Sequence, residues 1–440
     1  MQMDEGSRRG FLKHTGSQAV GAGAALAAGR AAGANRRLRL AVIGCGGQGT
    51  SGHVDGLASL QNDQVDLVYV CDPDRKRRTT AAERAGGAQP VADLRKILDD
   101  KSIDGVTIAT PDHWHVPAAL LALEAGKGVY LEKPCSHNVR EGRLLVDAVR
   151  RTGGVLQHGT QARSDPGFTE AVEMLRQGVI GEVLIARAWN IQRRSAIGSG
   201  QPGRPPAGLD YDTWVGPAPM IPFQANRHHY NWHWWYHYGT GDLGNDGVHE
   251  FDMARWGLGV GGHPSQVAVI GGKYFFDDDQ QFPDTVTATF EYPGDGTVGQ
   301  RKQLVFEMRI WCTNYPHQVD GGVEFYGTKG KLFVSRRGKF QVWGERNQKH
   351  AATLSRSPQM NVTRHLQTWI AALRGEGAAT ANAEVAHHAA TLCHLANIGC
   401  RVGRSFGFNP QEEAIVNDPE AAAGMRRAYR PEHWAVPGGV

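Results

Sequence analysis

The sequence predicts an α/β protein with two sheets. A doubly wound parallel sheet comes first, and an α+β domain with a large, mostly antiparallel sheet follows it. Short apolar runs alternate with helical patterns from about residue 36 to residue 160, which is the βαβ rhythm of a parallel sheet. After Gln161, strand-like runs follow one another without intervening helices, which indicates an antiparallel sheet in a separate domain.

The first domain is predicted to contain five strands. The run Leu38–Ile43 is apolar on both faces, as expected of a buried parallel strand. Further strands are expected at residues 65–72, 104–110, 128–134 and 154–160, with helices between them at 116–126 and 139–153. The predicted domain therefore covers residues 36–160.

The second domain is predicted to cover residues 161–440. A helix at 168–177 leads into strands at 182–191, 266–276, 285–293, 302–311, 322–335 and 339–345. The glycine-, proline- and serine-rich stretch 195–208 is expected to form an exposed loop. A final helical region at about 362–404 is expected to pack back on the first domain.

A leader precedes both domains. Ser-Arg-Arg-Gly-Phe-Leu-Lys at 7–13 contains Arg8 and Arg9, a weakly apolar stretch follows, and Ala32-Gly33-Ala34 offers a small-residue cleavage site. The pattern predicts a twin-arginine signal peptide over residues 1–34, the twin-arginine export machinery as a partner, and a periplasmic or otherwise exported protein. A disordered basic tail is the alternative. The stretch is too short and glycine-rich to span a membrane.

Composition excludes several functional classes. The formal net charge is +4, and the leader carries about half of it, so no nucleic-acid partner is expected. The six cysteines are scattered without metal-ligand spacing, so no structural metal is predicted, while disulfides stay open. No membrane-spanning segment is expected.

A glycine motif follows the first strand. Gly44, Gly46 and Gly49 fit G-x-G-x-x-G, with Cys45 and Gln48 inside the motif, between a strand and a helix. Such glycines permit a tight turn, the approach of a pyrophosphate to the backbone, and close helix packing. We therefore predict a Rossmann domain that binds NAD through this turn. A glycine turn that only packs a helix is the alternative.

The end of the second strand bears on cofactor choice. Asp72 can accept hydrogen bonds from the adenine ribose, which favours NAD. The basic run 75–78 follows at once and can neutralise a 2′-phosphate, so NADP is possible.

Glu132-Lys133-Pro134, together with the glycine turn and "ATPDHWHV" at 109–116, resembles the Gfo/Idh/MocA oxidoreductases. The resemblance runs over about 36–410. It implies a two-domain, NAD(P)-dependent enzyme that acts on sugars or cyclitols, and we expect a homo-oligomer formed through the C-terminal sheet. It places Lys133 between the nicotinamide and a substrate hydroxyl, where an ammonium can polarise the hydroxyl or relay its proton. A surface lysine at a strand end is the alternative.

The same resemblance implies further cofactor neighbours. The residues expected to border the cofactor are Thr110, Pro111, His113, His115, Glu132 and Gln161, and Arg163 is expected near the substrate. For His113 and His115 there is an alternative: one of the two histidines only caps the helix that follows.

Residues 226–259 combine five histidines with many tryptophans and tyrosines. Aromatic faces such as that of Trp232 stack on sugar rings. By resemblance, His249 is the catalytic proton acceptor, and an imidazole suits that task. Relatives often carry an aspartate four residues earlier, where this chain has Asn245, with Asp246 next to it. Asp246 belongs either to the proton relay or to an N-cap.

Three more residues resemble substrate-side positions of secreted relatives. They are Trp214, within "LDYDTWVGPAP" at 209–219, and the downstream Arg227 and Tyr230.

The leading hypothesis is an exported NAD(P)-dependent oxidoreductase that acts on a sugar, glycoside or cyclitol and retains its cofactor. NAD is not freely available outside the cytoplasm, and twin-arginine export carries folded proteins. One alternative is an NAD-dependent glycoside hydrolase or lyase that works by transient oxidation at C3 and elimination. Another is a non-catalytic sugar-binding protein.

Overall fold

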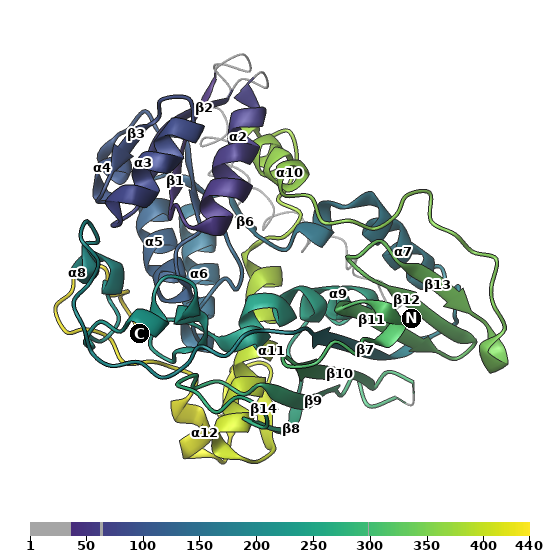
Figure 1. The fold of residues 1–440 in the computed structure, drawn as a ribbon. Helices are drawn as coiled ribbons and strands as arrows, with labels where there is room; N and C mark the ends of the chain where they lie inside the picture. Colours follow the sequence, from purple (N-terminus) through teal and green to yellow (C-terminus); the bar gives the residue numbers. More distant parts are fainter. Residues whose placement is uncertain (1–36, 62–64, 298) are drawn as a thin grey trace, which may run out of the picture.

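The computed structural model describes residues 37–61, 65–297 and 299–440. The predicted signal peptide at 1–34 lies outside the described residues. Figure 1 shows a domain of strands and helices, in purple and blue, beside a broad second sheet in green. The predicted fold class is confirmed.

The first domain is built on a six-stranded parallel sheet of order β3-β2-β1-β4-β5-β6. Its central strands are almost wholly buried, as the apolar runs predicted. The strands are β1 (Leu38–Ile43), β2 (Val65–Cys71), β3 (Gln89–Val91), β4 (Gly105–Ile108), β5 (Gly128–Leu131) and β6 (Leu156–His158). The sequence analysis missed β3, which has only three residues, one of them a proline.

Helices connect the strands. They are η1 (Gln48–Val54), α2 (Asp55–Ser59), α3 (Arg75–Arg84), α4 (Arg95–Asp99), α5 (Asp112–Glu124) and α6 (Val139–Thr152). Local chemistry sets the bounds of α6: the Asn138 side chain accepts from Glu141 N–H, and Gly153 ends the helix with φ +61°.

The second domain contains a nine-stranded sheet of order β13-β12-β11-β7-β10-β9-β8-β14-β15. Neighbouring strands are antiparallel except β7 and β10, which are parallel. The strands are β7 (Val183–Ile191), β8 (Gln266–Gly272), β9 (Thr285–Tyr292), β10 (Lys302–Arg309), β11 (Gly321–Gly327), β12 (Gly330–Val334), β13 (Phe340–Trp343), β14 (Phe406–Asn409) and β15 (Ala414–Val416).

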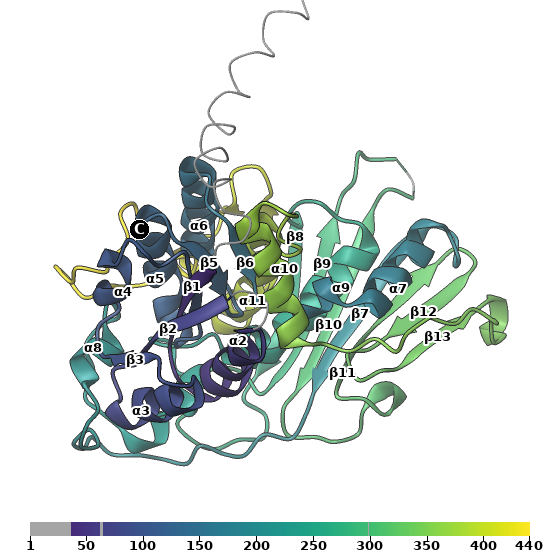
Figure 2. The ribbon, with the colours of Figure 1, turned by 90° about the horizontal axis from the view of Figure 1, so that it is seen from above.

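One face of this sheet is covered by α7 (Pro166–Arg176), α9 (Val248–Leu258) and α11 (Ala383–Val402), as Figure 2 shows from above. Phe251 stacks on Phe306 in the core between them. The other helical segments are η3 (Gln161–Ser164), α8 (Tyr211–Val215), η4 (Ala225–Arg227), η5 (Asn231–Trp234), η6 (Leu243–Gly247), η7 (Pro316–Gln318), η8 (Glu345–Asn347), α10 (Val362–Arg374) and α12 (Pro419–Ala423).

Helix α10 lies against the first domain, and glycines make room for it. A Cβ on Gly128 would stand 2.1 Å from Leu373 Cδ2, and one on Gly105 would stand 2.9 Å from the Trp369 ring. Helix α11 contacts α6 of the first domain as well as α9 of the second. The two domains therefore share helices at their junction.

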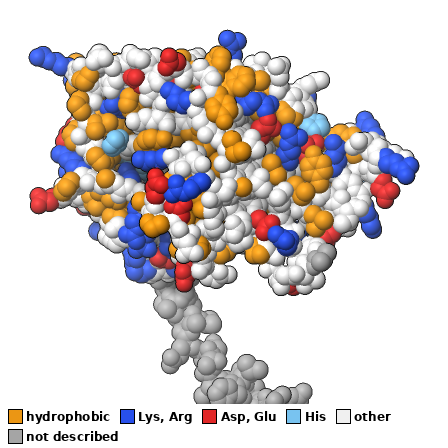
Figure 3. Space-filling view, turned by 90° about the horizontal axis from the view of Figure 1, so that it is seen from below, with side chains coloured by type: hydrophobic (Ala, Val, Ile, Leu, Met, Phe, Trp, Pro, Cys, Tyr) orange, Lys and Arg blue, Asp and Glu red, His pale blue; other side chains and the backbone are white. Residues whose placement is uncertain are grey.

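All six cysteines are free thiols in the structure. None of the helices in the described part of the chain combines the length and apolar character that a membrane crossing requires. Figure 3 shows basic and acidic side chains interspersed on one face of the molecule.

Candidate active site

A cleft of about 390 Å³ opens at the carboxyl ends of the parallel strands. In a doubly wound sheet, ligands bind where the strand order reverses, which here lies between β1 and β4. One wall, the strand-end wall, consists of residues at or just after the ends of β1, β2, β4 and β5. The opposite wall, the aromatic wall, comes from the connection between β7 and α9 and includes Trp214, His229, Tyr230, Trp232, His233 and Asn245.

Three glycines of the turn have no room for a side chain. Gly44 has φ +92°, and a Cβ there would stand 2.5 Å from the Ala109 carbonyl carbon. A Cβ on Gly49 would stand 1.8 Å from Gly44 O, and one on Gly46 would stand 2.9 Å from Arg77 Nη1. Protein atoms therefore crowd these three positions, whereas a Cβ on Gly47 would meet nothing within 4 Å. Gly44, Gly46 and Gly47 line the cleft, and such a backbone turn fits a dinucleotide pyrophosphate.

Asp72 closes the end of the turn. Its Oδ2 accepts from Cys45 N–H at 2.8 Å and its Oδ1 accepts from Asp74 N–H at 2.8 Å. Burial raises the pKa of Asp72. The Cys45 thiol is buried and points at the Cys71 carbonyl oxygen, so Cys45 serves the turn through its backbone and does not line the cleft. Of the basic run 75–78, only Arg77 lines the cleft.

Glu132 is a buried carboxylate that lines the cleft. It accepts hydrogen bonds from Gln48 Nε2 at 2.9 Å and His53 Nε2 at 3.0 Å. Burial acts to raise the pKa of Glu132, but the contacts with His53 and Lys133 outweigh it and hold the pKa well below its usual range. Gln161 Nε2 lies 3.5 Å from Glu132 Oε1, and Gln161 does not line the cleft.

Lys133 reaches across to the aromatic wall. Its Nζ donates to Asn245 O at 2.6 Å and to Asn245 Oδ1 at 3.0 Å. Asn245 in turn donates through Nδ2 to Asp242 Oδ1 at 3.0 Å. The structure thus brings together two of the residues that the sequence analysis assigned to catalysis.

Of the cofactor residues predicted in the segment after β4, three line the cleft and one does not. Thr110, Pro111 and His115 line the cleft, and the buried Thr110 Oγ1 has no hydrogen-bond partner. A buried, unpartnered hydroxyl at this position fits a bound cofactor. His113 lies behind the cleft instead, with its Nε2 3.1 Å from Trp214 O.

Asp112 lines the cleft between these residues, and the sequence analysis did not select it. Its Oδ2 accepts from Thr240 Oγ1 at 2.6 Å. Burial raises its pKa to about 7, and this outweighs the Thr240 hydrogen bond and the Lys133 charge.

Asp246 is not an N-cap. Helix α9 begins at Val248 after Gly247 and has no side-chain cap, because η6 runs into it without a break. The Asp246 carboxylate instead binds Arg194 Nη2 at 2.5 Å and Gln192 Nε2 at 2.7 Å. Burial acts to raise its pKa, but Arg336 and Lys133 hold it well below the usual range. The N-cap alternative is therefore wrong.

His249 lies on α9 and is almost fully buried. Burial, Arg336 and Lys133 lower the pKa of His249 well below its usual value, so its imidazole is neutral. Its Nδ1 is buried without a partner, while no hydrogen bond engages Nε2 among the described residues. A neutral ring with an unengaged nitrogen can accept a proton.

Of the residues assigned to substrate, Trp214, Tyr230 and Trp232 line the cleft. Arg163, Arg227 and His249 do not line it. For the two arginines, their contacts with the protein correct the assignment. Arg163 forms two 2.8 Å hydrogen bonds with the buried Asp252. Arg227 donates to Pro222 O and packs over the Trp235 ring at 4.2 Å. Protein groups therefore already occupy both guanidinium groups.

The sequence analysis missed several cleft residues besides Asp112. His229 and His233 lie in the aromatic stretch that it singled out as a whole. Trp434, from the C-terminal tail, lines the cleft beside Trp114, and nothing in the local sequence indicated this. Arg194, which does not line the cleft but joins Asp242 and Asp246, is not part of any motif in the sequence.

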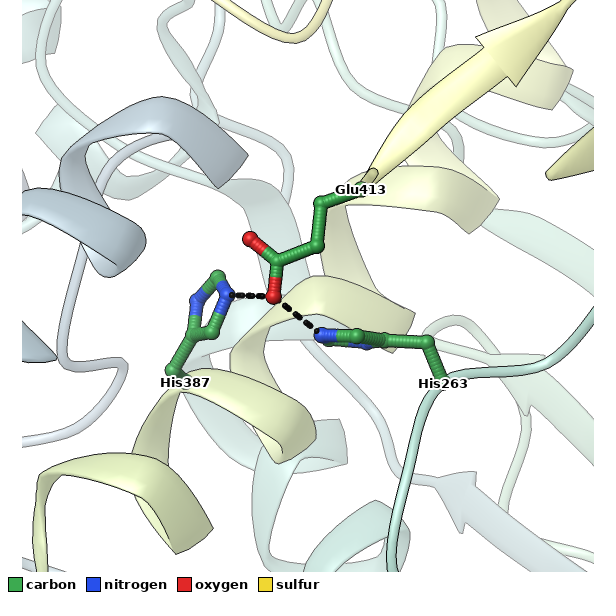
Figure 4. Close-up of side chains that lie close together, drawn as sticks. All are labelled: His263, His387 and Glu413. Atoms are coloured by element: carbon green, nitrogen blue, oxygen red, sulfur yellow. Dashed lines mark hydrogen bonds and ion pairs between the residues drawn. The ribbon is translucent and has the colours of Figure 1, made fainter. Parts of the chain in front are cut away.

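One group outside the cleft has the composition of a metal site. Figure 4 shows His263 Nε2 and His387 Nε2 converging on one oxygen of Glu413, at 2.9 and 3.0 Å. Arg143 binds the same carboxylate through Nε at 2.9 Å and through Nη2. The guanidinium pairs with the carboxylate, so the group ties α6 to α11 and to the turn between β14 and β15.

Comparisons with known proteins agree with this geometry. Residues 38–160 match the model of an oxidoreductase family described as an NAD-binding Rossmann fold, and residues 189–436 match its C-terminal alpha/beta domain. Inositol 2-dehydrogenase 2 of Saccharopolyspora erythraea is 30% identical over 50% of this chain and 54% of its own length. The D-glucoside 3-dehydrogenase of Escherichia coli is 31% identical over 37% of this chain and 46% of its own.

The chain thus spans about half the length of the curated relatives that it matches. Among solved structures, a levoglucosan dehydrogenase in complex with NADH and levoglucosan superposes with a TM-score of 0.64. It is 20% identical, and the match covers 84% of this chain and 99% of that one. At this identity the likeness shows the fold.

Proposed function

The chain belongs to the Gfo/Idh/MocA family of oxidoreductases, and from that premise we propose that it oxidises a hydroxyl of a sugar, glycoside or cyclitol with NAD(P). The observation that carries this proposal is the position of Lys133. It stands at the end of β5, lines the cleft next to the glycine turn, and donates across the cleft to Asn245. The relatives' names, an inositol and a glucoside dehydrogenase, support the substrate class.

In this proposal, each residue of the site has a separate role. The bound dinucleotide supplies the hydride acceptor. Lys133 Nζ turns from Asn245 to donate a hydrogen bond to the substrate hydroxyl oxygen, which stabilises charge on that oxygen as its proton leaves. The neutral His249 accepts the proton, directly or through one water. Trp214 and Trp232 offer faces for a sugar ring.

NAD is the favoured dinucleotide. Asp72 stands at the end of β2 and lines the cleft, where a ribose hydroxyl can donate to it. Arg77 also lines the cleft and is the one cation of the 75–78 run that could pair with a 2′-phosphate.

We propose that the cofactor is retained, because a strap of residues 208–230 closes over the adenosine side of the cleft. Arg75 N–H donates to Gly208 O at 3.0 Å, and Asp210 N–H donates to Pro73 O at 3.2 Å. Further along the strap, His229 Nε2 contacts Asp74 Oδ2 at 2.9 Å. A dinucleotide beneath these contacts leaves only after they open.

Export through the twin-arginine pathway is a further part of the proposal. It rests on Arg8 and Arg9 in the leader, which lies outside the described residues. Cofactor retention and export support one another, since an exported enzyme must carry its dinucleotide with it. Pairing through the open face of the nine-stranded sheet, where Ile270 is 75% exposed, is the assembly that we propose.

The test uses the purified protein as produced. Denaturation should release about one NAD(H) per chain. Methyl β-D-glucopyranoside, levoglucosan and myo-inositol are then added in turn, and absorbance at 340 nm follows the bound cofactor. Reduction by one of them supports the proposal. Cleavage of the glucoside without net reduction would favour the redox-neutral hydrolase or lyase. Protein that lacks dinucleotide and fails to bind added NAD would contradict both.

A further inference from the structure

His233 is held rigidly in the aromatic wall. It lies in η5 and lines the cleft together with Lys133. Its ring stacks on Trp232 with centroids 3.6 Å apart and an interplanar angle of 20°. The Tyr230 ring packs on it at 4.7 Å. These contacts fix the plane of the imidazole.

One hydrogen bond then fixes its tautomer. His233 Nδ1 lies 2.5 Å from the Tyr230 carbonyl oxygen. A carbonyl oxygen only accepts, so Nδ1 carries the hydrogen and Nε2 carries the lone pair. No described residue hydrogen-bonds to Nε2, and Nε2 is not among the buried polar atoms without a partner. Nε2 is therefore an acceptor that remains open to the cleft.

The surroundings keep this ring uncharged. Burial is the main cause that lowers the pKa of His233 to about 3, and the neighbouring Lys133 and Arg194 charges act in the same direction. Asp246 opposes them and is outweighed. Near neutral pH the imidazole is thus neutral, so the Nε2 lone pair is available to accept a hydrogen bond.

From this geometry we infer that His233 Nε2 accepts a hydrogen bond from a second substrate hydroxyl, distinct from the one that Lys133 addresses, and so selects polyols. The inference rests on the proposed function. His233 is a substrate-binding residue that determines specificity, since a fixed acceptor rejects a substrate that lacks the donor. Neither the stack on Trp232 nor the bond to Tyr230 uses Nε2, so the scaffold does not account for it.

Two amide substitutions separate the two nitrogens. In His233→Asn the amide reaches the Nδ1 position and can still donate to the Tyr230 carbonyl, but nothing reaches the Nε2 position. In His233→Gln the side-chain carbonyl can reach the Nε2 position and accept. His237→Asn is the matched control, because His237 lies in the same stretch and does not line the cleft.

We measure KM and kcat with methyl β-D-glucopyranoside and its single-deoxy analogues on the NAD-loaded protein. His233→Asn should raise KM about tenfold, with kcat within threefold and unchanged NAD content. His233→Gln should recover most of the loss, and His237→Asn should match the wild type. One deoxy analogue should be poor for the wild type and no worse for His233→Asn. Equal KM for the wild type and His233→Asn would overturn the inference.

A second measurement does not depend on turnover. A long-range ¹H–¹⁵N correlation spectrum of labelled protein reports the protonation of both ring nitrogens, and His233→Gln assigns the signal. We expect Nδ1–H and no titration between pH 5 and pH 8. A ring with Nε2–H, or one that titrates in this window, would overturn the inference for every substrate. Inactivity of all variants and the wild type on every polyol would contradict the proposed function instead.

Discussion

The two walls of the cleft are stabilised by different physical means. Backbone geometry shapes the strand-end wall: Gly44 turns with a positive φ, and Asp72 accepts the N–H groups that follow the strands. Side-chain ion pairs shape the aromatic wall. Arg194 binds both Asp242 and Asp246 there, on a connection that has little regular structure.

The difference explains what each wall can do. A wall made of backbone turns offers N–H groups at fixed positions, which suits phosphates that are common to every cofactor molecule. A wall made of side chains can differ between relatives, which suits substrate choice. Two hydrogen bonds between side chains join the walls near the proposed reaction site: Lys133 donates to Asn245, and Thr240 donates to Asp112.

The largest effect is expected where the walls meet at Lys133. Lys133→Met keeps the length of the side chain and removes the ammonium. Turnover should fall by about 10²–10⁴, the usual contribution of an acid–base group, while NAD stays bound. Steady-state rates and released cofactor are the measurements. Lys302→Met, which removes a half-buried ammonium outside the cleft, should leave both unchanged. Near-normal turnover of Lys133→Met would refute the role of Lys133.

The next effect is expected at His249, which lies on α9 just after the aromatic wall. His249→Ala should lower turnover by about 10²–10⁴ at saturating substrate, with unchanged dinucleotide content. The ring is buried, so melting temperature must be measured beside the rate to separate chemistry from folding. A variant that melts normally and retains near-normal turnover would exclude His249 as the proton acceptor.

The pH dependence of stability tests the ionisation of Asp112, the residue that accepts the hydrogen bond from Thr240. Burial raises the pKa of Asp112 to about 7, from an ordinary value of 3.8. Between these values the folded state holds a proton that the unfolded state has lost, so this group makes stability fall as pH rises from about 4 to 7. Each pKa unit corresponds to about 1.4 kcal/mol, so the change amounts to a few kcal/mol.

Asp112→Asn keeps the shape and removes this titration. The free energy of unfolding of the variant minus that of the wild type should rise by a few kcal/mol from pH 4 to pH 7, as measured by denaturant unfolding of both proteins at several pH values. Glu250, whose pKa burial also raises to about 7, titrates in both proteins and cancels in the difference. Parallel pH profiles for the two proteins would show that Asp112 is ionised in the folded state.

The strand-end wall could be read from the sequence because each of its residues follows a strand. The glycine turn, Asp72 and Lys133 stand where the apolar runs stop, and parallel strands bring their carboxyl ends to one edge. Even on this wall, the motif did not predict the side-chain direction of Cys45, whose thiol faces the protein interior. A motif position fixes the backbone and leaves the side-chain direction open.

The aromatic wall could be predicted only in composition. Arg227 was expected at the substrate, yet it packs over the Trp235 ring. Arg163, which lies in η3 outside this wall, was expected near the substrate as well, yet it pairs with Asp252. Such pairings depend on residues far apart in the chain, so no local pattern shows them. Trp434 is the extreme case, because it reaches the cleft from the C-terminal tail.

A smaller effect is expected at Asp72 on the strand-end wall. Asp72→Ser removes the acceptor that favours NAD, and loss of a hydrogen bond to a charged group costs about 1.5–3 kcal/mol, or tenfold and more in affinity. Titrations with NAD and NADP should show weaker NAD binding and a narrower preference. Because Asp72 also holds two backbone N–H groups, the melting temperature should fall too. An unchanged preference would assign cofactor choice to Arg77.

The smallest effect concerns the strap, where a side chain of the aromatic wall binds the strand-end wall. Asp74 caps α3 by accepting from Lys76 and Arg77 N–H, and it also contacts His229 Nε2. Asparagine caps a helix as well as aspartate does, so Asp74→Asn should preserve α3 and weaken only the contact with His229. A single hydrogen bond contributes about 0.5–1.5 kcal/mol, so NAD should dissociate about two- to tenfold faster.

His229→Phe removes the same contact from the other side and should give a similar rate, while the double variant should be no faster than either. Rates of cofactor loss into an excess of a dinucleotide scavenger make the comparison. If neither variant releases NAD faster, the strap does not retain the cofactor, and retention must come from the strand-end wall alone.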